Sequence, residues 1–296
     1  MSITAEVIIL FIVVLVGALC KKLNYFTDET IHGTTQIVVN VTLPCLTISN
    51  MQRPFAADVL VNFLLTLALS SAVILFSLVA TRFLFRKRDA ARRAVLVNME
   101  AFSNCGFMGY PIILAINPDW MMYAVAYNIA FTFISWTIGV SLYGNGSRMN
   151  LRRALLNPNV FSAFIGFTLF CCNVTLPAIP AEALALIGGL TTPLSMLLIG
   201  TRVCGVHIAD FKDRDYHIAA ALRLVIIPLI VYTALRPFPL APAVASTVFI
   251  LTAMPSGTMT AMQAELYGGD TVFAARAIAY TTLLSLVSVP VMSMLL

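Results

Sequence analysis

Charged residues are scarce in this sequence. Only 10% of the 296 residues are Asp, Glu, Lys or Arg, whereas 60% are hydrophobic. Soluble domains carry about 25% charged residues, so a soluble protein of this composition would need a very large core and almost no polar surface. Apolar stretches of about 20 residues recur along the whole chain, and they predict an all-α polytopic membrane protein.

Motifs for catalysis and for metal binding are also missing. The sequence contains no G-x-S-x-G, no HExxH and no Walker motif, and its six Cys residues show no CxxC spacing. The three His residues are scattered, and Asp210, Asp213 and Asp215 fall in an expected loop rather than inside a span. We therefore expect no metal, no cofactor and no ATP hydrolysis by this chain. An intramembrane enzyme and an ion channel remain as alternatives to a transporter.

Ten membrane spans are expected from the apolar stretches. Their approximate bounds are 3–23, 31–51, 59–85, 94–116, 121–143, 158–174, 183–204, 216–235, 243–267 and 271–296.

The basic residues predict how these spans are oriented. Fifteen of the 18 Lys and Arg residues fall in or next to the loops that follow the odd-numbered spans, whereas Arg53 and Arg236 lie on the opposite side. Cytoplasmic loops carry the excess of Lys and Arg, so both termini are expected outside the cell membrane. The net charge of +5 then follows from topology and implies no nucleic-acid partner. The cluster from Arg86 to Arg93 is expected to contact anionic lipids of the bilayer.

Two apolar stretches contain residues that cannot continue a helix. The first is Asn104-Cys105-Gly106-Phe107-Met108-Gly109-Tyr110-Pro111, and the second is Met254-Pro255-Ser256-Gly257-Thr258. Proline lacks the N–H that a helix needs, and broken backbone inside a membrane is tolerated only where it is buried in protein or lines a cavity. Both breaks are expected about 16–18 Å along their spans, near the middle of the bilayer.

The two halves of the chain share a spacing. Gly17 precedes Pro44 by 27 residues, and Gly166 precedes Pro193 by the same number. Together with the matched breaks in spans 4 and 9, this predicts two five-helix repeats, 1–147 and 148–296. Because five is odd, the second repeat is inverted, an arrangement that places substrate near discontinuous helices. The positive N-terminal ends of the half-helices would suit an anion.

With these motifs in view, the sequence resembles the auxin efflux carrier family, including bacterial members known as malate or malonate permeases. The matching segments are Asn40–Pro44, Asn104–Pro111, Thr192–Gly200, Pro255–Gly257 and Tyr267–Asp270. The resemblance implies ten helices in inverted halves, crossing spans 4 and 9, and secondary transport of small carboxylates by alternating access. It also implies a homodimer and an elevator-like movement of one helical bundle. The short linker between spans 5 and 6 argues against auxin itself as substrate.

The substrate site is expected at the two breaks and in span 2. The candidate residues are Asn104, Cys105, Gly106, Tyr110, Pro111, Pro255, Ser256, Gly257, Thr258 and Asn40. The alternative is that the polar members only satisfy backbone groups freed by the breaks.

Two charges are expected inside the membrane. Glu100 and Arg223 lie at similar depths from the same face, about 10–12 Å. Intramembrane charges are costly unless paired, so we expect a structural ion pair. In the alternative, Glu100 carries a proton or Arg223 binds the anion. The coupling ion, proton or sodium, stays open.

Overall fold

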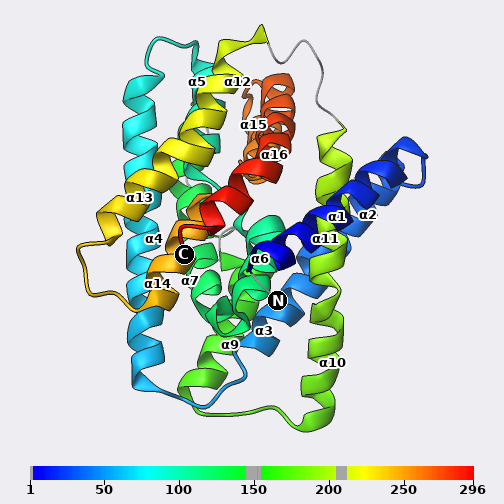
Figure 1. Cartoon of the computed structure of the whole chain (residues 1–296), viewed down its shortest axis with the longest axis vertical. Coiled ribbons are helices and arrows are strands. Elements are labelled where there is room, and N and C mark those ends of the chain that lie inside the picture. The colour runs from blue at the N-terminus through cyan, green and yellow to red at the C-terminus, as the bar shows by residue number, and fades with distance from the viewer. Residues whose placement is uncertain (1–2, 145–151, 153–154, 205–211) are drawn as a thin grey trace.

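The computed structural model describes residues 3–144, 152, 155–204 and 212–296. These residues form helices joined by turns, and they contain one isolated β-bridge (Figure 1). The prediction of an all-helical protein is confirmed for this part of the chain. The expected boundary after residue 147 lies outside the described residues, as do Arg148, Arg153 and Asp210.

Each half of the chain contributes a series of helices (Figure 1). The first half contains α1 (Ile3–Lys22), α2 (Asp28–Ile37), α3 (Leu43–Asn50), α4 (Ala57–Leu84), α5 (Ala90–Ala101), α6 (Tyr110–Ile116) and α7 (Met121–Ile134). The second half contains α9 (Pro158–Cys171), α10 (Ala178–Gly189), α11 (Thr191–Val203), α12 (Arg214–Ala221), α13 (Ile227–Leu235), α14 (Pro242–Thr252), α15 (Met259–Tyr267) and α16 (Thr271–Ser293). Short helical turns are η1 (Val38–Thr42), η2 (Cys105–Gly109), η3 (Pro118–Trp120), η4 (Ser135–Gly139) and η6 (Leu222–Ile226).

Five helical stretches of the described chain are long and apolar enough to cross a membrane. They are Ala57–Leu84, Pro118–Gly139, Ala178–Val203, Arg214–Leu235 and Thr271–Ser293. Shorter apolar helices accompany them, which fits a multi-pass membrane protein.

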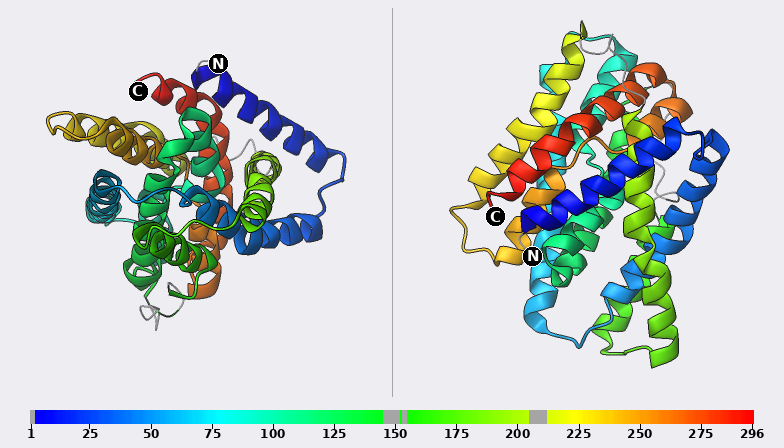
Figure 2. Two further views of the ribbon diagram at one scale, coloured as in Figure 1. Left: turned by 90° about the horizontal axis from the view of Figure 1, so that it is seen from below. Right: turned by 45° about the vertical axis from the view of Figure 1, so that its right-hand side comes forward.

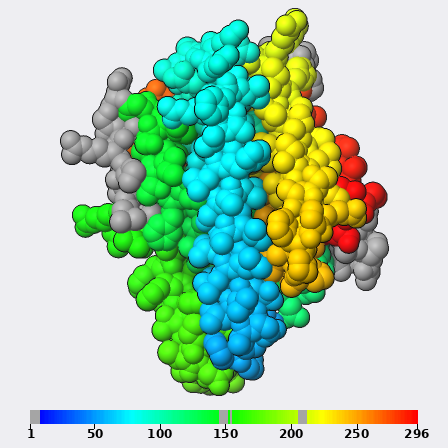
Figure 3. All heavy atoms as spheres, turned by 90° about the vertical axis from the view of Figure 1, so that its left-hand side faces the viewer, coloured from blue at the N-terminus to red at the C-terminus, as the bar shows by residue number. Residues whose placement is uncertain are grey.

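Helix α4 presents its apolar residues outward. Val61 and Val79 are more than half exposed, whereas Thr66, Ser70 and Ser77 are buried against the protein. This reverses the pattern of a soluble protein, and it is expected where lipid is the solvent and small polar residues mediate helix packing. Figure 3 shows α4 as a continuous column on the face of the molecule, beside the helices of the second half.

Three wide turns of π-helix precede prolines. In η1, η2 and η6 the hydrogen bond that closes the turn spans five residues, as in Leu43 N–H to Val38 O and Ile227 N–H to Leu222 O. Pro44, Pro111 and Pro228 follow directly, each as the second residue of the next helix. A proline removes one helical hydrogen bond and clashes with the carbonyl four residues back, and the wider turn accommodates both effects.

Helices α1 and α11 cross at glycines. A Cβ on Gly17 would lie 2.2 Å from the Leu197 carbonyl oxygen, and a Cβ on Gly200 would lie 2.1 Å from the Val14 carbonyl oxygen. Only glycine lets the two backbones approach so closely. Figure 2 shows α1 crossing α11 and running beside α16, with both termini near one another.

The most enclosed part of the molecule lies around α5, α7 and α14. Every residue from Ala94 to Ala101 is buried, as is every residue from Thr247 to Gly257. The two segments that interrupt helical structure, after α5 and after α14, are therefore held inside the protein rather than at its surface.

Candidate functional site

The segments after α5 and α14 meet and pair with each other. Ser103 and Ser256 form an antiparallel β-bridge. The Asn104 N–H donates to the Pro255 carbonyl oxygen at 2.8 Å, and the Gly257 N–H donates to the Phe102 carbonyl oxygen at 2.8 Å. Each segment thereby satisfies backbone groups of the other, as is required where no water is present.

Gly257 is needed for this close approach. A Cβ at this position would lie 2.9 Å from the Ser103 carbonyl oxygen and 3.0 Å from that of Phe102. The fully buried Ser256 also helps to hold the crossing, because its hydroxyl donates to the Met99 carbonyl oxygen at 3.2 Å. Its role is to satisfy the end of α5, which is the alternative considered for the polar residues of the breaks.

Arg223 joins the ends of α5 and α14. It lies in the wide turn η6 and is 1% exposed. Its Nε donates to the Met254 carbonyl oxygen at 2.9 Å, and its Nη2 donates to that of Thr252 at 2.7 Å. Its Nη1 donates to the Glu100 carbonyl oxygen at 2.5 Å. One guanidinium thus serves three carbonyls at the ends of two helices, which have no partner within their helices.

The expected ion pair between Glu100 and Arg223 is therefore corrected. Arg223 contacts the backbone of Glu100, and all three of its bonds go to carbonyl oxygens. Both carboxylate oxygens of Glu100 are buried and accept no hydrogen bond from a described residue. Helix ends compete with the carboxylate for the guanidinium, and sequence depth alone does not indicate which acceptor is chosen. Arg223 is turned toward these carbonyls and is not among the residues that line the cavity beside the crossing.

A cavity of about 730 Å³ opens beside the crossing. Its walls come from α2 and η1, from the segment 103–107, from α7, from the segment 257–259 and α15, and from the end of α11. Cys105 and Met259, the first residues of η2 and α15, both line this space, so the N-terminal ends of these two elements border one cavity. The first amides of a helix have no acceptor within the helix, and they carry partial positive charge.

Half of the expected substrate residues line this cavity. They are Asn104, Cys105, Gly106, Gly257 and Thr258. Tyr110, Pro111, Pro255 and Ser256 are buried in the packing behind the crossing. Asn40 is exposed elsewhere on its helix, where its amide donates to Gln36 Oε1 at 2.6 Å. Gln36 and Val39 line the cavity from this part of the chain, and Asn40 does not.

Several cavity residues were not expected from the sequence. Asn128 and Thr132 contribute polar groups from α7, and the Thr132 hydroxyl donates to Asn128 Oδ1 at 3.2 Å. Their spacing of four residues, continued by Trp136, places them on one face of a helix. This spacing is the feature of the sequence that could have identified them. Arg202 lines the cavity from the last turn of α11. Among the described residues, no cluster of three or more His, Cys, Asp or Glu side chains could hold a metal ion.

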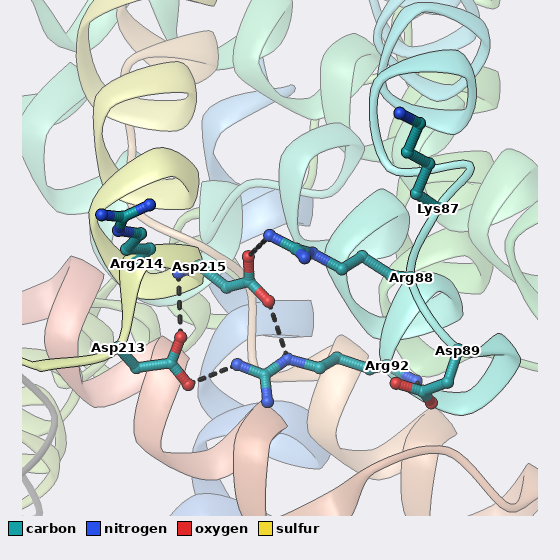
Figure 4. A pocket seen from close by; sticks show the side chains of 7 residues that line it. All are labelled: Lys87, Arg88, Asp89, Arg92, Asp213, Arg214 and Asp215. Carbon is teal, nitrogen blue, oxygen red and sulfur yellow. Dashed lines mark hydrogen bonds and ion pairs between the residues drawn. The ribbon is translucent and has the colours of Figure 1, made fainter.

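A second, shallow cavity of about 490 Å³ lies between the start of α5 and the start of α12. Figure 4 shows Arg88 and Arg92 reaching toward Asp213 and Asp215. Arg88 Nη2 lies 2.5 Å from Asp215 Oδ1, Arg92 Nε lies 2.9 Å from Asp215 Oδ2, and Arg92 also contacts the Asp213 carboxylate. Two arginines of the cluster expected to contact lipid are thus engaged by carboxylates of the second half. We interpret the residues around this cavity as an ion-pair network that joins the starts of α5 and α12.

Opposing influences act on the pKa of the Asp213 carboxyl. Burial by itself would raise the pKa of its carboxyl, but hydrogen bonds from the Asp215 N–H and from Arg92 outweigh it, so the pKa lies below the ordinary value. Asp213 also caps α12, since its side chain accepts from the Asp215 N–H at 2.9 Å.

The family model and the relatives that this chain matches are described as membrane transporters. The chain matches the model of a family described as membrane transport protein over residues 2–147 and again over residues 145–293. It is 25% identical to an uncharacterized transporter of Methanothermobacter thermautotrophicus, over 100% of this chain and 99% of the relative. It is 21% identical to an uncharacterized transporter of Methanocaldococcus jannaschii, over 95% of this chain and 94% of the relative. The chain therefore belongs to this membrane transport family, the auxin efflux carrier family that its motifs resemble.

Proposed function

We propose that this protein is a secondary transporter of small organic anions, mono- or dicarboxylates, which works by alternating access. The observation that carries the proposal is the cavity of about 730 Å³ bordered by the N-terminal ends of η2 and α15. The helix dipole favours a carboxylate at this position, and N–H groups of the first helical turns that the crossing does not use can donate to it. Asn104 and Thr258 add side-chain hydrogen-bonding groups next to these amides.

The proposal includes ten spans in two inverted repeats. Contacts between α1 and α11, and between α9 and α3, support it. Gly17 approaches Gly200 in one crossing, and Gly166 approaches Met51 in the other. Gly166 follows Gly17 by 149 positions, and Gly200 follows Met51 by the same number. An exchange of this kind, in which equivalent residues trade partners, is what a pseudo-two-fold axis produces.

We place the open side of the cavity toward the cytoplasm. Its rim includes Asp28, Asn157 and Arg202, which belong to the side where the basic loops gather. The positive-inside rule assigns that side to the cytoplasm, with both termini outside. In this assignment the structure is the inward-facing state. In the outward-facing state, the same half-helix ends would be exposed to the outside. Helices α1–α3 and α9–α11 would form the static part of a homodimer.

Coupling is proposed at the crossing itself. Glu100 is a carboxyl buried in the last turn of α5, and no described residue donates a hydrogen bond to it. Its carbonyl is fixed by Arg223, so a change of charge on the side chain would act on the end of α5. A proton is therefore the coupling ion we favour over sodium.

The experiment is uptake into proteoliposomes of purified protein. A panel of labelled acetate, malonate and malate is tested with proton, sodium and voltage gradients imposed one at a time. Uptake of at least one carboxylate above empty liposomes is expected, with stimulation by the proton gradient. Asn104→Ala is expected to reduce uptake while the protein keeps its unfolding temperature. Failure of every carboxylate under every gradient would overturn the substrate class.

A further inference from the structure

The cavity contains an arginine that has no partner within the described protein. Arg202 lines it from the last turn of α11 and is only partly exposed. It forms no hydrogen bond and no ion pair with another described residue. Guanidinium groups away from bulk water are normally paired, because an unpaired charge loses hydration without compensation. The empty donors of Arg202 therefore indicate a missing acceptor.

The other charged groups around the cavity do not supply this acceptor. Asp28 is paired with Lys21 at 2.7 Å and its side chain is 97% exposed. Glu265 is exposed on the surface of α15 and makes no ion pair with Arg202 within 4.0 Å. His32 is exposed at the same rim. Arg202 is thus the only cation of the described cavity wall that is both partly enclosed and unpaired.

We propose that Arg202 is the residue that captures the carboxylate of the substrate at the cytoplasmic mouth of the cavity. This inference rests on the proposed function and names the cation that it lacks. Arg223, the arginine expected from the sequence, donates to three backbone carbonyls and does not line the cavity. Arg202 supplies the fork of N–H donors that a carboxylate binds in bidentate geometry. The substrate then passes from Arg202 to the half-helix ends and Asn104, which lie deeper along the same cavity wall.

The test compares Arg202→Gln and Arg202→Lys with wild type in two measurements. The first is the concentration dependence of carboxylate uptake from the side that exposes the cavity. The second is the shift of the unfolding temperature in detergent on adding acetate, malonate or malate. Arg202→Gln is expected to raise KM about tenfold or more, with kcat less affected, and to lose the shift. Arg202→Lys is expected to recover part of both, since it keeps the charge but not the fork.

Lys22→Gln is the matched control. Lys22 is an exposed cation at the end of α1, the helix that packs on α11, and it does not line the cavity. It removes the same charge from the same side of the molecule, so its KM and its temperature shift are expected to equal those of wild type. An equal loss in Lys22→Gln would mean that general surface charge, and not Arg202, attracts the anion.

The remaining outcomes separate the two proposals. If wild type and Arg202→Gln transport carboxylates with the same KM and show the same shift, the role of Arg202 is overturned and the function stands. If no carboxylate is transported or stabilises wild type, both are overturned. A third outcome is that phosphatidylglycerol, and no carboxylate, stabilises wild type more than Arg202→Gln. This outcome would assign Arg202 to a lipid headgroup and overturn its role in substrate capture.

Discussion

Arg223 Nη1 donates to the backbone carbonyl oxygen of Glu100 at 2.5 Å, although a carboxylate stands on the same residue. The same guanidinium reaches the carbonyl oxygens of Thr252 and Met254 on the other side of the crossing. A buried carbonyl without a donor is as costly as a lost hydrogen bond. Arg223 therefore fixes the ends of α5 and α14 relative to each other, next to η2 and α15, which border the cavity.

The first prediction concerns the clamp that Arg223 forms with the three carbonyl oxygens at the ends of α5 and α14. Arg223→Gln is expected to lower the unfolding temperature strongly, because glutamine cannot reach three carbonyls and each bond to a charged group contributes about 1.5–3 kcal/mol. Arg223→Lys keeps the charge but lacks the planar fork, so an intermediate loss is expected. The measurement is thermal unfolding of purified protein in detergent, together with carboxylate uptake.

Arg236→Gln serves as the control for the clamp. Arg236 follows α13, and its guanidinium lies over the ring of Tyr232 at 4.9 Å. Its replacement removes an arginine from the same span without touching the crossing, and an unchanged unfolding temperature is expected. The clamp would be refuted by an Arg223→Gln protein that unfolds at the wild-type temperature.

The second prediction concerns the crossing of α1 and α11. Gly200→Ala would place a Cβ 2.1 Å from the Val14 carbonyl oxygen, and Gly17→Ala would place one 2.2 Å from that of Leu197. Neither neighbour can move aside, because both are backbone atoms within helices. Each variant is expected to separate the helices and to lower the yield of folded protein, measured by monodispersity on size exclusion and by unfolding temperature.

Gly33→Ala is the matched substitution for this test. Gly33 lies in α2, and nothing would stand within 4 Å of its Cβ. Alanine is favoured over glycine inside a helix by about 0.5–1 kcal/mol, so a neutral or slightly higher unfolding temperature is expected. Comparable losses in all three variants would show that close packing at Gly17 and Gly200 is not the cause.

Much of the fold could be predicted because local chemistry determines it. Lipid requires long apolar helices, so hydropathy indicates where helices run. A proline removes a specific backbone donor, and the segments that contain Pro111 and Pro255 coincide with the interruptions between α5 and α6 and between α14 and α15. The bonds that hold the ends together could not be predicted. Depth placed Glu100 and Arg223 at one level, but the choice of Arg223 between a carboxylate and three carbonyls depends on helix rotation.

The sequence predicted the candidate site correctly only for residues whose position in the backbone, next to a helix start, places them at the cavity. Asn104 and Thr258 face the cavity because they immediately flank the start of η2 and α15. Asn40 does not line it, and its amide instead donates to Gln36, which does. Arg202 is one of the fifteen basic residues that the sequence assigns to the cytoplasmic side, and composition does not indicate which side of a helix end faces a cavity.

The third prediction concerns pH. The pKa of Asp213 is lowered in the folded protein, although burial opposes this, by the Asp215 N–H and by Arg92. The stability it contributes is therefore complete above the ordinary pKa of an aspartate, about 3.9, and is lost as pH falls through the lower folded value. The unfolding temperature of Asp213→Asn is expected below that of wild type at pH 6, with the difference shrinking below about pH 4.

Arg92→Gln tests the same contact from the other partner. If the Asp213–Arg92 bond is the source of the effect, the double variant should lose less than the sum of the two single losses. Additive losses, or a difference between Asp213→Asn and wild type that is constant from pH 6 to pH 3, would contradict the assignment. The N-cap of α12 is also lost in Asp213→Asn only in part, because asparagine is itself a good cap.

The fourth prediction concerns the polar pair on α7. Asn128→Ala is expected to raise KM for the transported carboxylate about two- to tenfold, since it removes a hydrogen-bonding group from the cavity wall. Thr132→Val keeps the shape of the side chain and removes the hydroxyl that donates to Asn128 Oδ1. A smaller change in the same direction is expected, with kcat nearly constant in both variants.

The double variant Asn128→Ala/Thr132→Val distinguishes a positioning role from direct contact. If Thr132 acts only by orienting Asn128, its loss adds nothing once Asn128 is gone, and the double variant should match Asn128→Ala. Additive effects would instead mean that Thr132 contacts the substrate itself. Thr137→Val is the control, since Thr137 follows in η4, donates to the Phe133 carbonyl oxygen at 2.6 Å and does not line the cavity. A KM change in Thr137→Val as large as that in Asn128→Ala would indicate that altered helix packing causes the effect. It would contradict a direct role of Asn128 in binding substrate at the cavity wall.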